Sequence, residues 1–130
     1  MSRVLFVDDQ PFFLTYYQNI LTAKGFQVLT ASSGEEGLKE AAKVQPDLII
    51  LDMEMPGLDG IEVCSMLKAN ETTQHIPIVI LTATLDPKLN EKAFQAGAEA
   101  TVLKSMNTDR LLNLLHVVLT TERGVPNEEG

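Results

Sequence analysis

Five short apolar runs, separated by stretches with helical spacing, constrain the fold of this chain more than any other feature. The runs span residues 3–7, 26–31, 47–51, 76–81 and 100–103. Each has the length and composition of a β-strand. Helical spacing appears between the runs, for example at Phe13, Tyr17, Ile20 and Lys24. Strands that alternate with helices form parallel sheets, because parallel neighbours need crossover connections, so the sequence predicts an α/β fold.

The composition of the runs predicts their order in the sheet. The first, third and fourth runs are continuously apolar, as expected for strands buried on both faces, whereas the second and fifth contain Gln27, Thr30 and Thr101. The second and fifth runs are therefore the predicted edges, which gives the doubly wound order 2-1-3-4-5. In this architecture ligands bind at the carboxyl ends of the first and third strands, where the winding reverses.

Capping signals support the predicted helix boundaries. Ser33, followed three residues later by Glu36, predicts a capping box at the start of a helix. Asp86-Pro87 predicts an N-cap followed by proline at the first helical position. The helices between the strands are therefore expected to begin at these residues.

Length and charge exclude several classes of function. A chain of 130 residues has room for one domain, and a net charge of −8 argues against a direct nucleic-acid or anionic-membrane surface. Cys64 has no second cysteine to pair with, and there is no signal-peptide pattern or membrane-length apolar run, so we expect a cytoplasmic protein. Apolar periodicity ends after Thr121. We expect residues 1–121 to form the domain and residues 122–130 to be a flexible acidic tail or the start of a linker.

Carboxylates end two neighbouring strands of the predicted sheet. Asp8 and Asp9 follow the first strand, and Asp52 follows the third. Acidic groups this close repel one another and raise each other's pKa unless a cation lies among them. Oxygen ligands alone favour Mg²⁺ or a similar ion such as Mn²⁺. We therefore expect a metal site here, against the alternative that each aspartate merely caps a helix or turn.

Two further polar residues fall at the same edge of the predicted sheet. Thr82 closes the fourth strand and Lys104 follows the fifth. Together with the acids they would form a site with a metal, a carboxylate nucleophile and two groups able to contact a phosphoryl oxygen. These are the components that phosphoryl transfer needs.

The chain resembles the receiver domain of two-component response regulators, the family of the single-domain chemotaxis regulator. The resemblance covers residues 3 to about 121 and rests on four motifs: VDD at 7–9, DLIILDMEMPGLDG at 47–60, ILTA at 80–83 and VLK at 102–104. It implies a flavodoxin-like (βα)5 three-layer sandwich. It also implies a phosphoacceptor switch, which catalyses its own phosphorylation and dephosphorylation and is not an enzyme in the usual sense.

The resemblance implies a role for each acid. Asp52 would accept a phosphoryl group from a phosphohistidine on a sensor histidine kinase or a histidine phosphotransfer protein. Asp9 and Asp52 would bind Mg²⁺ directly together with the backbone carbonyl of Glu54, and Asp8 would act through a water. The surplus apolar Phe12 at the start of the first helix marks that helix as the expected docking surface for the kinase.

The resemblance also implies how the signal leaves the site. Thr82 would bond the phosphoryl group and Lys104 would pair with it, which alters the face made by the fourth helix, fifth strand and fifth helix. The signal would pass to a downstream protein, to an output domain missing from this chain, or into a phosphorylation-dependent dimer. Two positions depart from the family, which commonly has an aromatic residue and a proline where this chain has Thr101 and Ser105.

Two other classes of protein fit part of this pattern. A Mg²⁺-dependent phosphohydrolase or phosphotransferase acting on small molecules also uses an aspartyl phosphate. Glu54 only half fits the second acid of such an enzyme, and 130 residues leave no room for a cap domain. An interaction module that is never phosphorylated would lack the acceptor, a metal-binding acid or the lysine, and all of these are present.

Overall fold

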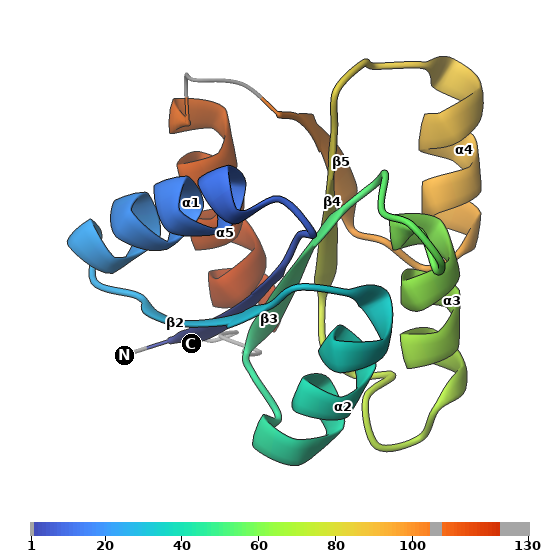
Figure 1. Ribbon diagram of the computed structural model, residues 1–130, viewed down its shortest axis with the longest axis horizontal. Coiled ribbons are helices and arrows are strands. Elements are labelled where there is room, and N and C mark those ends of the chain that lie inside the picture. The colour runs from blue at the N-terminus through green and yellow to red at the C-terminus, as the bar shows by residue number, and fades with distance from the viewer. Residues whose placement is uncertain (1, 105–107, 123–130) are drawn as a thin grey trace.

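The computed structural model describes residues 2–104 and 108–122, which alternate between strand and helix (Figure 1). The strands are β1 (Arg3–Val7), β2 (Gln27–Ala31), β3 (Leu48–Asp52), β4 (Ile78–Thr82) and β5 (Ala100–Leu103). The helices are α1 (Pro11–Ala23), α2 (Gly34–Val44), α3 (Gly60–Ala69), α4 (Pro87–Gln95) and α5 (Asp109–Glu122). The five strands form one parallel sheet in the order β2-β1-β3-β4-β5, which confirms the predicted order.

Helices cover both faces of this sheet and complete a three-layer sandwich (Figure 1). Helices α1 and α5 lie on one face, and α2, α3 and α4 lie on the other. Successive side chains of β1 enter different cores, as the two-residue period of a strand requires. Leu5 and Val7 pack with α2, α3 and α4, whereas Val4 and Phe6 pack with α1 and α5. The fold is thus the predicted doubly wound α/β architecture.

The burial of the strands explains their order. Every residue of β3 and β4 is buried, whereas Gln27 in β2 and Leu103 in β5 are exposed. Strands in the middle of a doubly wound sheet are covered on both faces, and edge strands are not. The prediction that the second and fifth strands are the edges is therefore correct.

The residues at helical spacing in the first helix coincide only in part with its buried face. Helix α1 buries Tyr17 and Leu21, which lie one turn apart, whereas Ile20 is only half-buried. Lys24 is exposed and caps the helix. The neighbouring apolar residues Ile20 and Leu21 fit two different helical faces, and packing against the sheet selects the face that contains Leu21.

The predicted capping box before α2 is only half formed. Ser33 Oγ accepts a hydrogen bond from the N–H of Glu36 at 3.1 Å, as expected. The carboxylate of Glu36 instead accepts hydrogen bonds from the N–H and the hydroxyl of Ser32, at 2.6 and 2.9 Å. The other predicted cap is correct, since Asp86 accepts a hydrogen bond from the N–H of Lys88 before α4.

A tight return of the chain fixes the end of β3. The N–H of Gly60, the first residue of α3, donates to the carbonyl of Met53 at 2.9 Å. A Cβ atom at Gly60 would lie 2.5 Å from the backbone oxygen of Asp52, so only glycine fits at this position. Asp59 and Glu62 form a full capping box around it. The backbone after Asp52 is therefore held closely against the start of α3.

Some sequence predictions lie outside the part of the chain that the structure describes. Ser105 and residues 123–130 lie outside the described residues, so the effect of Ser105 and the proposed tail stay predictions. None of the helices in the described ranges, 2–104 and 108–122, has both the length and the apolar character that a membrane crossing requires.

Candidate functional site

Carboxylates from two adjacent strands meet at the carboxyl edge of the sheet. Asp8 and Asp9 directly follow β1, and Asp52 is the last residue of β3, its neighbour. One oxygen atom from each of these residues lies within 4.8 Å of the others. Asp8 is fully buried and Asp52 is 5% exposed. The structure therefore brings the three acidic site residues together at the switch point of the sheet.

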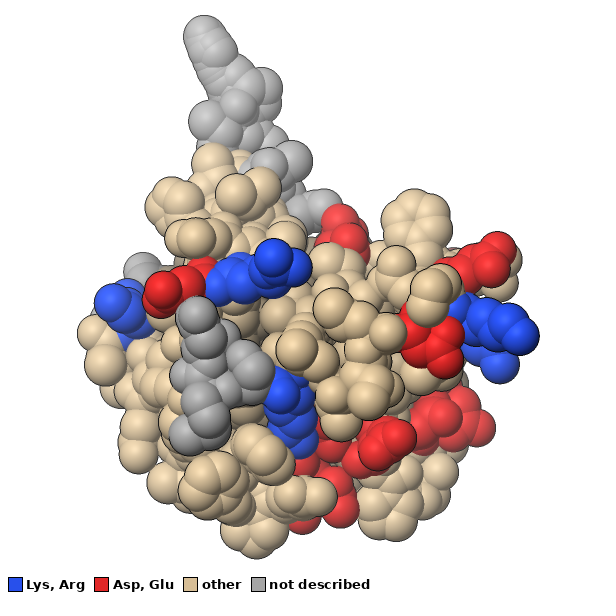
Figure 2. All heavy atoms as spheres, turned by 90° about the horizontal axis from the view of Figure 1, so that it is seen from above, with Lys and Arg blue, Asp and Glu red and all other residues tan. Residues whose placement is uncertain are grey.

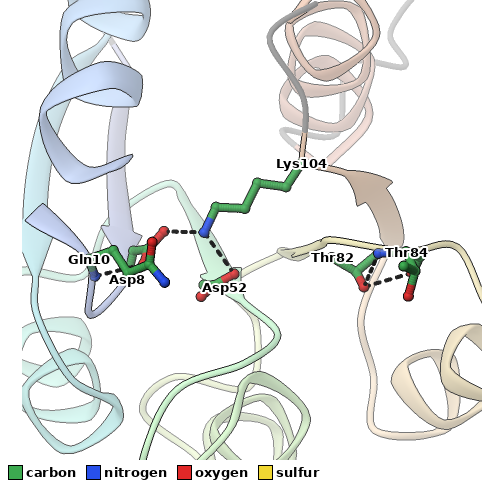
Figure 3. Close-up of polar contacts among 6 residues, drawn as sticks. All are labelled: Asp8, Gln10, Asp52, Thr82, Thr84 and Lys104. Atoms are coloured by element: carbon green, nitrogen blue, oxygen red, sulfur yellow. Dashed lines mark hydrogen bonds and ion pairs between the residues drawn. The ribbon is translucent and has the colours of Figure 1, made fainter. Parts of the chain in front are cut away.

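Lys104 places its ammonium group among these acids. Its Nζ lies 2.7 Å from Asp8 Oδ2 and 3.1 Å from Asp52 Oδ1 (Figure 3). Its backbone N–H donates to the carbonyl of Thr82 at 2.7 Å, which ties the start of the following loop to β4. A buried carboxylate is costly unless it is paired, so Lys104 supplies part of the compensation that Asp52 requires.

One oxygen of the acidic cluster lacks a partner within the described residues. Asp9 Oδ1 is buried and accepts no hydrogen bond from any group that the structure describes. Asp8 Oδ1, in contrast, accepts the N–H of Gln10 at 3.0 Å. An unpaired buried carboxylate oxygen beside two further carboxylates is suited to a cation. Because every donor is oxygen, the set fits a hard ion such as Mg²⁺.

The acceptor candidate holds its proton more tightly than an ordinary aspartate. Burial raises the pKa of Asp52 from 3.8 to about 6, and the charge of Asp8 raises it as well. The charge and hydrogen bond of Lys104 oppose this rise, and Asp9 adds a smaller contribution in the raising direction. Asp52 is therefore mostly ionised at neutral pH and becomes protonated in mild acid.

Thr82 lies at the same edge but is occupied by its own loop. Its hydroxyl donates to the carbonyl of Thr84 at 2.8 Å and accepts the N–H of Thr84 at 3.3 Å. Figure 3 shows this pair separate from the contacts of Lys104 with Asp8 and Asp52. Thr82 is thus placed beside the acids with its hydrogen bonds directed into the β4–α4 loop.

Glu54 lies in the loop after β3, two residues beyond Asp52. Its side chain is exposed and, with Met53, Met55 and Leu89, lines a neighbouring cavity of about 700 Å³. This carboxylate is not part of the group formed by Asp8, Asp9 and Asp52. The Glu54 side chain therefore lines this cavity and lies outside the acidic cluster.

Sequence reasoning missed three contacts at this site. These are the N–H of Gln10 on Asp8, the carbonyl of Thr84 on Thr82, and the ring of Phe13, whose centroid lies 3.8 Å from Lys104 Nζ. Gln10 and Thr84 contribute backbone atoms, which almost every residue type offers, so the sequence gives no signal for these contacts. The signal for Phe13 was its place four residues after Asp9, on the first turn of a helix that starts at the site.

Acidic and basic side chains lie close together on the face of the molecule that is seen from above. Figure 2, seen from above the view of Figure 1, shows acidic side chains gathered on one part of the surface with basic side chains beside them. Opposite charges thus meet at an accessible surface. A small anionic group could reach such a site only where a cation offsets the carboxylates.

This fold and this arrangement of acids, hydroxyl and lysine define a class of signalling domain. The family model of the response regulator receiver domain matches residues 4–116, so the chain belongs to that family. Receiver domains are modules of two-component signal transduction.

Particular relatives agree with this assignment. The transcriptional regulatory protein KdpE of Mycobacterium tuberculosis is 36% identical over 92% of this chain and 51% of its own length. The polar-differentiation response regulator DivK of Brucella ovis is 30% identical over 88% of this chain and 93% of its own length. The solved structure of the response regulator TrrA of Thermotoga maritima, in complex with Mg²⁺ and BeF, has a TM-score of 0.83 and 34% identity, over 91% of this chain and 99% of that one.

These relatives differ in length relative to this chain. The chain spans about half the length of KdpE, as it does for several other curated relatives that it matches. It spans nearly all of DivK. The receiver domain is therefore found in this family both within longer regulators and in chains of about this size.

Proposed function

We propose that this protein is a phosphoacceptor switch, in which Asp52 takes a phosphoryl group from a phosphohistidine on a partner protein. The observation that carries the proposal is the convergence of Asp8, Asp9 and Asp52 with Lys104 at the carboxyl edge of the sheet. The complex of TrrA with Mg²⁺ and BeF adds support from a relative. In the transfer, a carboxylate oxygen of Asp52 bonds to phosphorus while the bond from phosphorus to the histidine nitrogen breaks and its electron pair stays on the imidazole.

Each residue of the acidic cluster has a proposed place in this reaction. Asp9 and Asp52 would hold Mg²⁺ with the backbone carbonyl of Glu54, and Asp8 would act through a water. The bound ion would stabilise negative charge on the phosphoryl oxygens. Lys104 would exchange part of its pairing with Asp8 and Asp52 for a new phosphoryl oxygen, since its ammonium carries three donors.

Labelling with a small phosphodonor tests the reaction without a kinase. Incubation with acetyl phosphate and Mg²⁺, or Mn²⁺, should add one acid-labile phosphoryl group per chain, because the site supplies both nucleophile and charge stabilisation. EDTA should reduce labelling to background, and added Mg²⁺ in excess should restore it. Intact-protein mass spectrometry measures the stoichiometry. Labelling that persists in EDTA would contradict the proposed metal site.

We propose that Thr82 and the loop after it transmit the phosphorylated state. A phosphoryl oxygen on Asp52 would compete with the carbonyl of Thr84 for the Thr82 hydroxyl, which would release the β4–α4 loop. Thr101 on β5 donates its hydroxyl to the side-chain oxygen of Asn90 on α4. This short side chain replaces the aromatic residue common in the family, so the movement of α4 itself would carry the signal.

Amide exchange can locate the output surface. Addition of beryllofluoride and Mg²⁺ should change exchange rates mainly at residues 82–94 and around Lys104, because the released loop leads directly into α4. The Thr82→Ala variant should still bind beryllofluoride but lose the changes in α4. Changes confined to the acidic cluster in the wild type would contradict an output through the α4, β5 and α5 face.

The partner that receives the signal would bind the exposed apolar residues around α4 and β5. Exposed apolar residues lie in the β4–α4 loop (Leu85), on α4 (Phe94) and on β5 (Leu103), with 74% of the Phe94 side chain accessible. Exposed apolar residues of this kind are typical of interaction surfaces. We propose that a downstream protein, an output domain in a longer chain, or a second phosphorylated copy covers this face.

We propose that α1 forms the docking surface for the phosphohistidine-bearing kinase or phosphotransfer protein. Phe12 is 61% exposed at the first turn of α1, next to the acidic cluster. Its ring stacks on Tyr16 at 6.0 Å, so the two rings form one apolar surface on the outer side of the helix. Because α1 begins two residues after Asp9, we expect a partner that delivers a phosphoryl group to Asp52 to approach over this helix end.

Phe12→Ser separates docking from chemistry. We expect phosphotransfer from the partner protein to slow at least about tenfold, because a buried aromatic anchor at an interface contributes about 2 kcal/mol or more. Labelling by acetyl phosphate should stay at the wild-type rate, since the Phe12 side chain is largely exposed and supplies no group to the acidic cluster. Equal losses in both assays would show instead that Phe12 supports the fold of the site.

A further inference from the structure

The ammonium of Lys104 touches an aromatic ring as well as two acids. Lys104 Nζ lies 3.8 Å from the centroid of the Phe13 ring, close enough for a cation–π contact. The same nitrogen lies 2.7 Å from Asp8 Oδ2 and 3.1 Å from Asp52 Oδ1. The ring and the two carboxylates therefore contact the same cation, and only 8% of the Lys104 side chain is exposed.

The Phe13 ring is held firmly where it meets this cation. The backbone N–H of Phe13 donates to the carbonyl of Gln10 at 3.1 Å, in the first turn of α1. The ring meets Phe12 edge-on at 5.1 Å and stacks near Tyr17 at 6.3 Å. The N–H of Gln10 in turn binds Asp8. The segment that places Asp8 thus also places the ring.

We propose that Phe13 is a positioning residue for Lys104 in phosphoryl transfer, an inference that rests on the proposed function. A ring face attracts an ammonium but accepts no proton and forms no strong hydrogen bond, so the ammonium keeps its donors free for oxygen. When Mg²⁺ binds the carboxylates and weakens their ion pairs with Lys104, the ring would still hold Nζ beside Asp52. The long lysine side chain then needs less ordering when the phosphoryl group arrives.

A purely structural role for Phe13 makes a different prediction. Phe13 is half-buried and packs against the core under α1 and α5. If its role were purely structural, loss of this packing alone would explain the effect of removing the ring. Leucine preserves most of that apolar contact but has no aromatic face, whereas tyrosine preserves the face. Phe26 is half-buried in the same core and lies just before β2, at the edge of the sheet opposite the acids, so it offers a matched aromatic-to-leucine control.

Two measurements on Phe13→Leu, Phe13→Tyr and Phe26→Leu test the proposal. The first is the NMR shift of the Lys104 ε-methylene protons, which a ring face moves upfield. We expect that upfield shift in the wild type, Phe13→Tyr and Phe26→Leu, and its loss in Phe13→Leu. The second is the initial rate of labelling by acetyl phosphate with Mg²⁺. The labelling rate should fall about threefold to tenfold in Phe13→Leu, as loss of a cation–π contact predicts. In Phe13→Tyr the rate should equal that of the wild type.

The outcomes separate this inference from the proposed function. Wild-type labelling with an unchanged rate in Phe13→Leu would overturn the role of Phe13 and leave the proposed function intact. The same holds if Phe13→Tyr fails to restore the rate, or if Phe26→Leu slows labelling equally, since packing would then explain the loss. Absence of labelling in the wild type would overturn the proposed function and the positioning role together, even where the upfield shift of Lys104 is observed.

Discussion

Asp52→Asn is expected to reduce phosphoryl labelling to background, with either acetyl phosphate or a phosphohistidine donor. The amide keeps the size of the side chain but is a far weaker nucleophile than a carboxylate. Of the two neighbouring acids, Asp8 is fully buried, and Asp9 would hold the metal ion. Asp59→Asn is a matched control, because asparagine caps α3 nearly as well as aspartate and Asp59 is not in the acidic cluster. A covalent label that survives in Asp52→Asn, as detected by mass spectrometry, would assign the acceptor to another residue.

The same variant should stabilise the metal-free fold at neutral pH. Folding raises the pKa of Asp52 from 3.8 to about 6, so the folded state binds this proton more tightly than the unfolded state. Stability is therefore lost as pH rises from about 4 to about 6, and the full cost, up to about 3 kcal/mol, persists above pH 6. Asparagine has no such cost.

Urea unfolding in EDTA between pH 4 and pH 7.5 measures this difference. The stability advantage of Asp52→Asn should be largest above about pH 6 and shrink as pH falls toward 4. Excess Mg²⁺ should reverse the ranking, because the wild type alone keeps all three carboxylates. A difference that does not vary with pH would mean that ionisation of Asp52 does not cause it.

Gly60→Ala is expected to lower the free energy of unfolding by about 3 kcal/mol and to impair labelling at least about tenfold. The new Cβ would lie 2.5 Å from the backbone oxygen of Asp52 and 3.0 Å from Cα of Met53. Neither atom can yield by a change of rotamer, so the end of β3 must shift and the acceptor with it. Alanine gains about 1 kcal/mol of helix propensity over glycine, which is too little to offset the clash.

Gly37→Ala provides the comparison for Gly60→Ala. Its Cβ would also be crowded, at 2.9 Å, but by a methyl group of Val7 rather than by backbone. Side-chain repacking can relieve that contact, so the loss of stability should be smaller and labelling should stay near the wild-type rate. Urea unfolding measures the stability of both variants, and acetyl phosphate labelling measures their reaction rates. Equal effects would show that backbone contact at Asp52 is not the cause.

Most of the fold was predictable because the composition of each strand indicates how far it is buried. Continuous apolar runs mark the central strands, and polar residues such as Gln27 and Thr101 mark the edges. Once the strand order is known, the carboxyl ends of neighbouring strands must lie together, which predicts the meeting of Asp8 and Asp52. Topology alone therefore places the candidate site.

The details that sequence did not predict depend on choices between near-equal partners. Ile20 and Leu21 are both apolar, and only docking on the sheet decides which is buried. Ser32 and Ser33 can both bind Glu36, and the carboxylate selects Ser32. The hydroxyl of Thr82 donates to the carbonyl of Thr84 in its own loop, and a backbone partner of this kind cannot be read from the residue type.

The ion pair between Lys104 and Asp8 joins positions 96 residues apart in the chain. Contacts of such separation form late, because the entropy of closing a long loop is lost before the contact stabilises anything. Until β5 docks beside β4, the carboxylates of β1 and β3 lack their lysine and repel one another. Completion of the charged site should therefore coincide with the last step of folding, and a chain that has not finished folding would present no competent acceptor to a kinase.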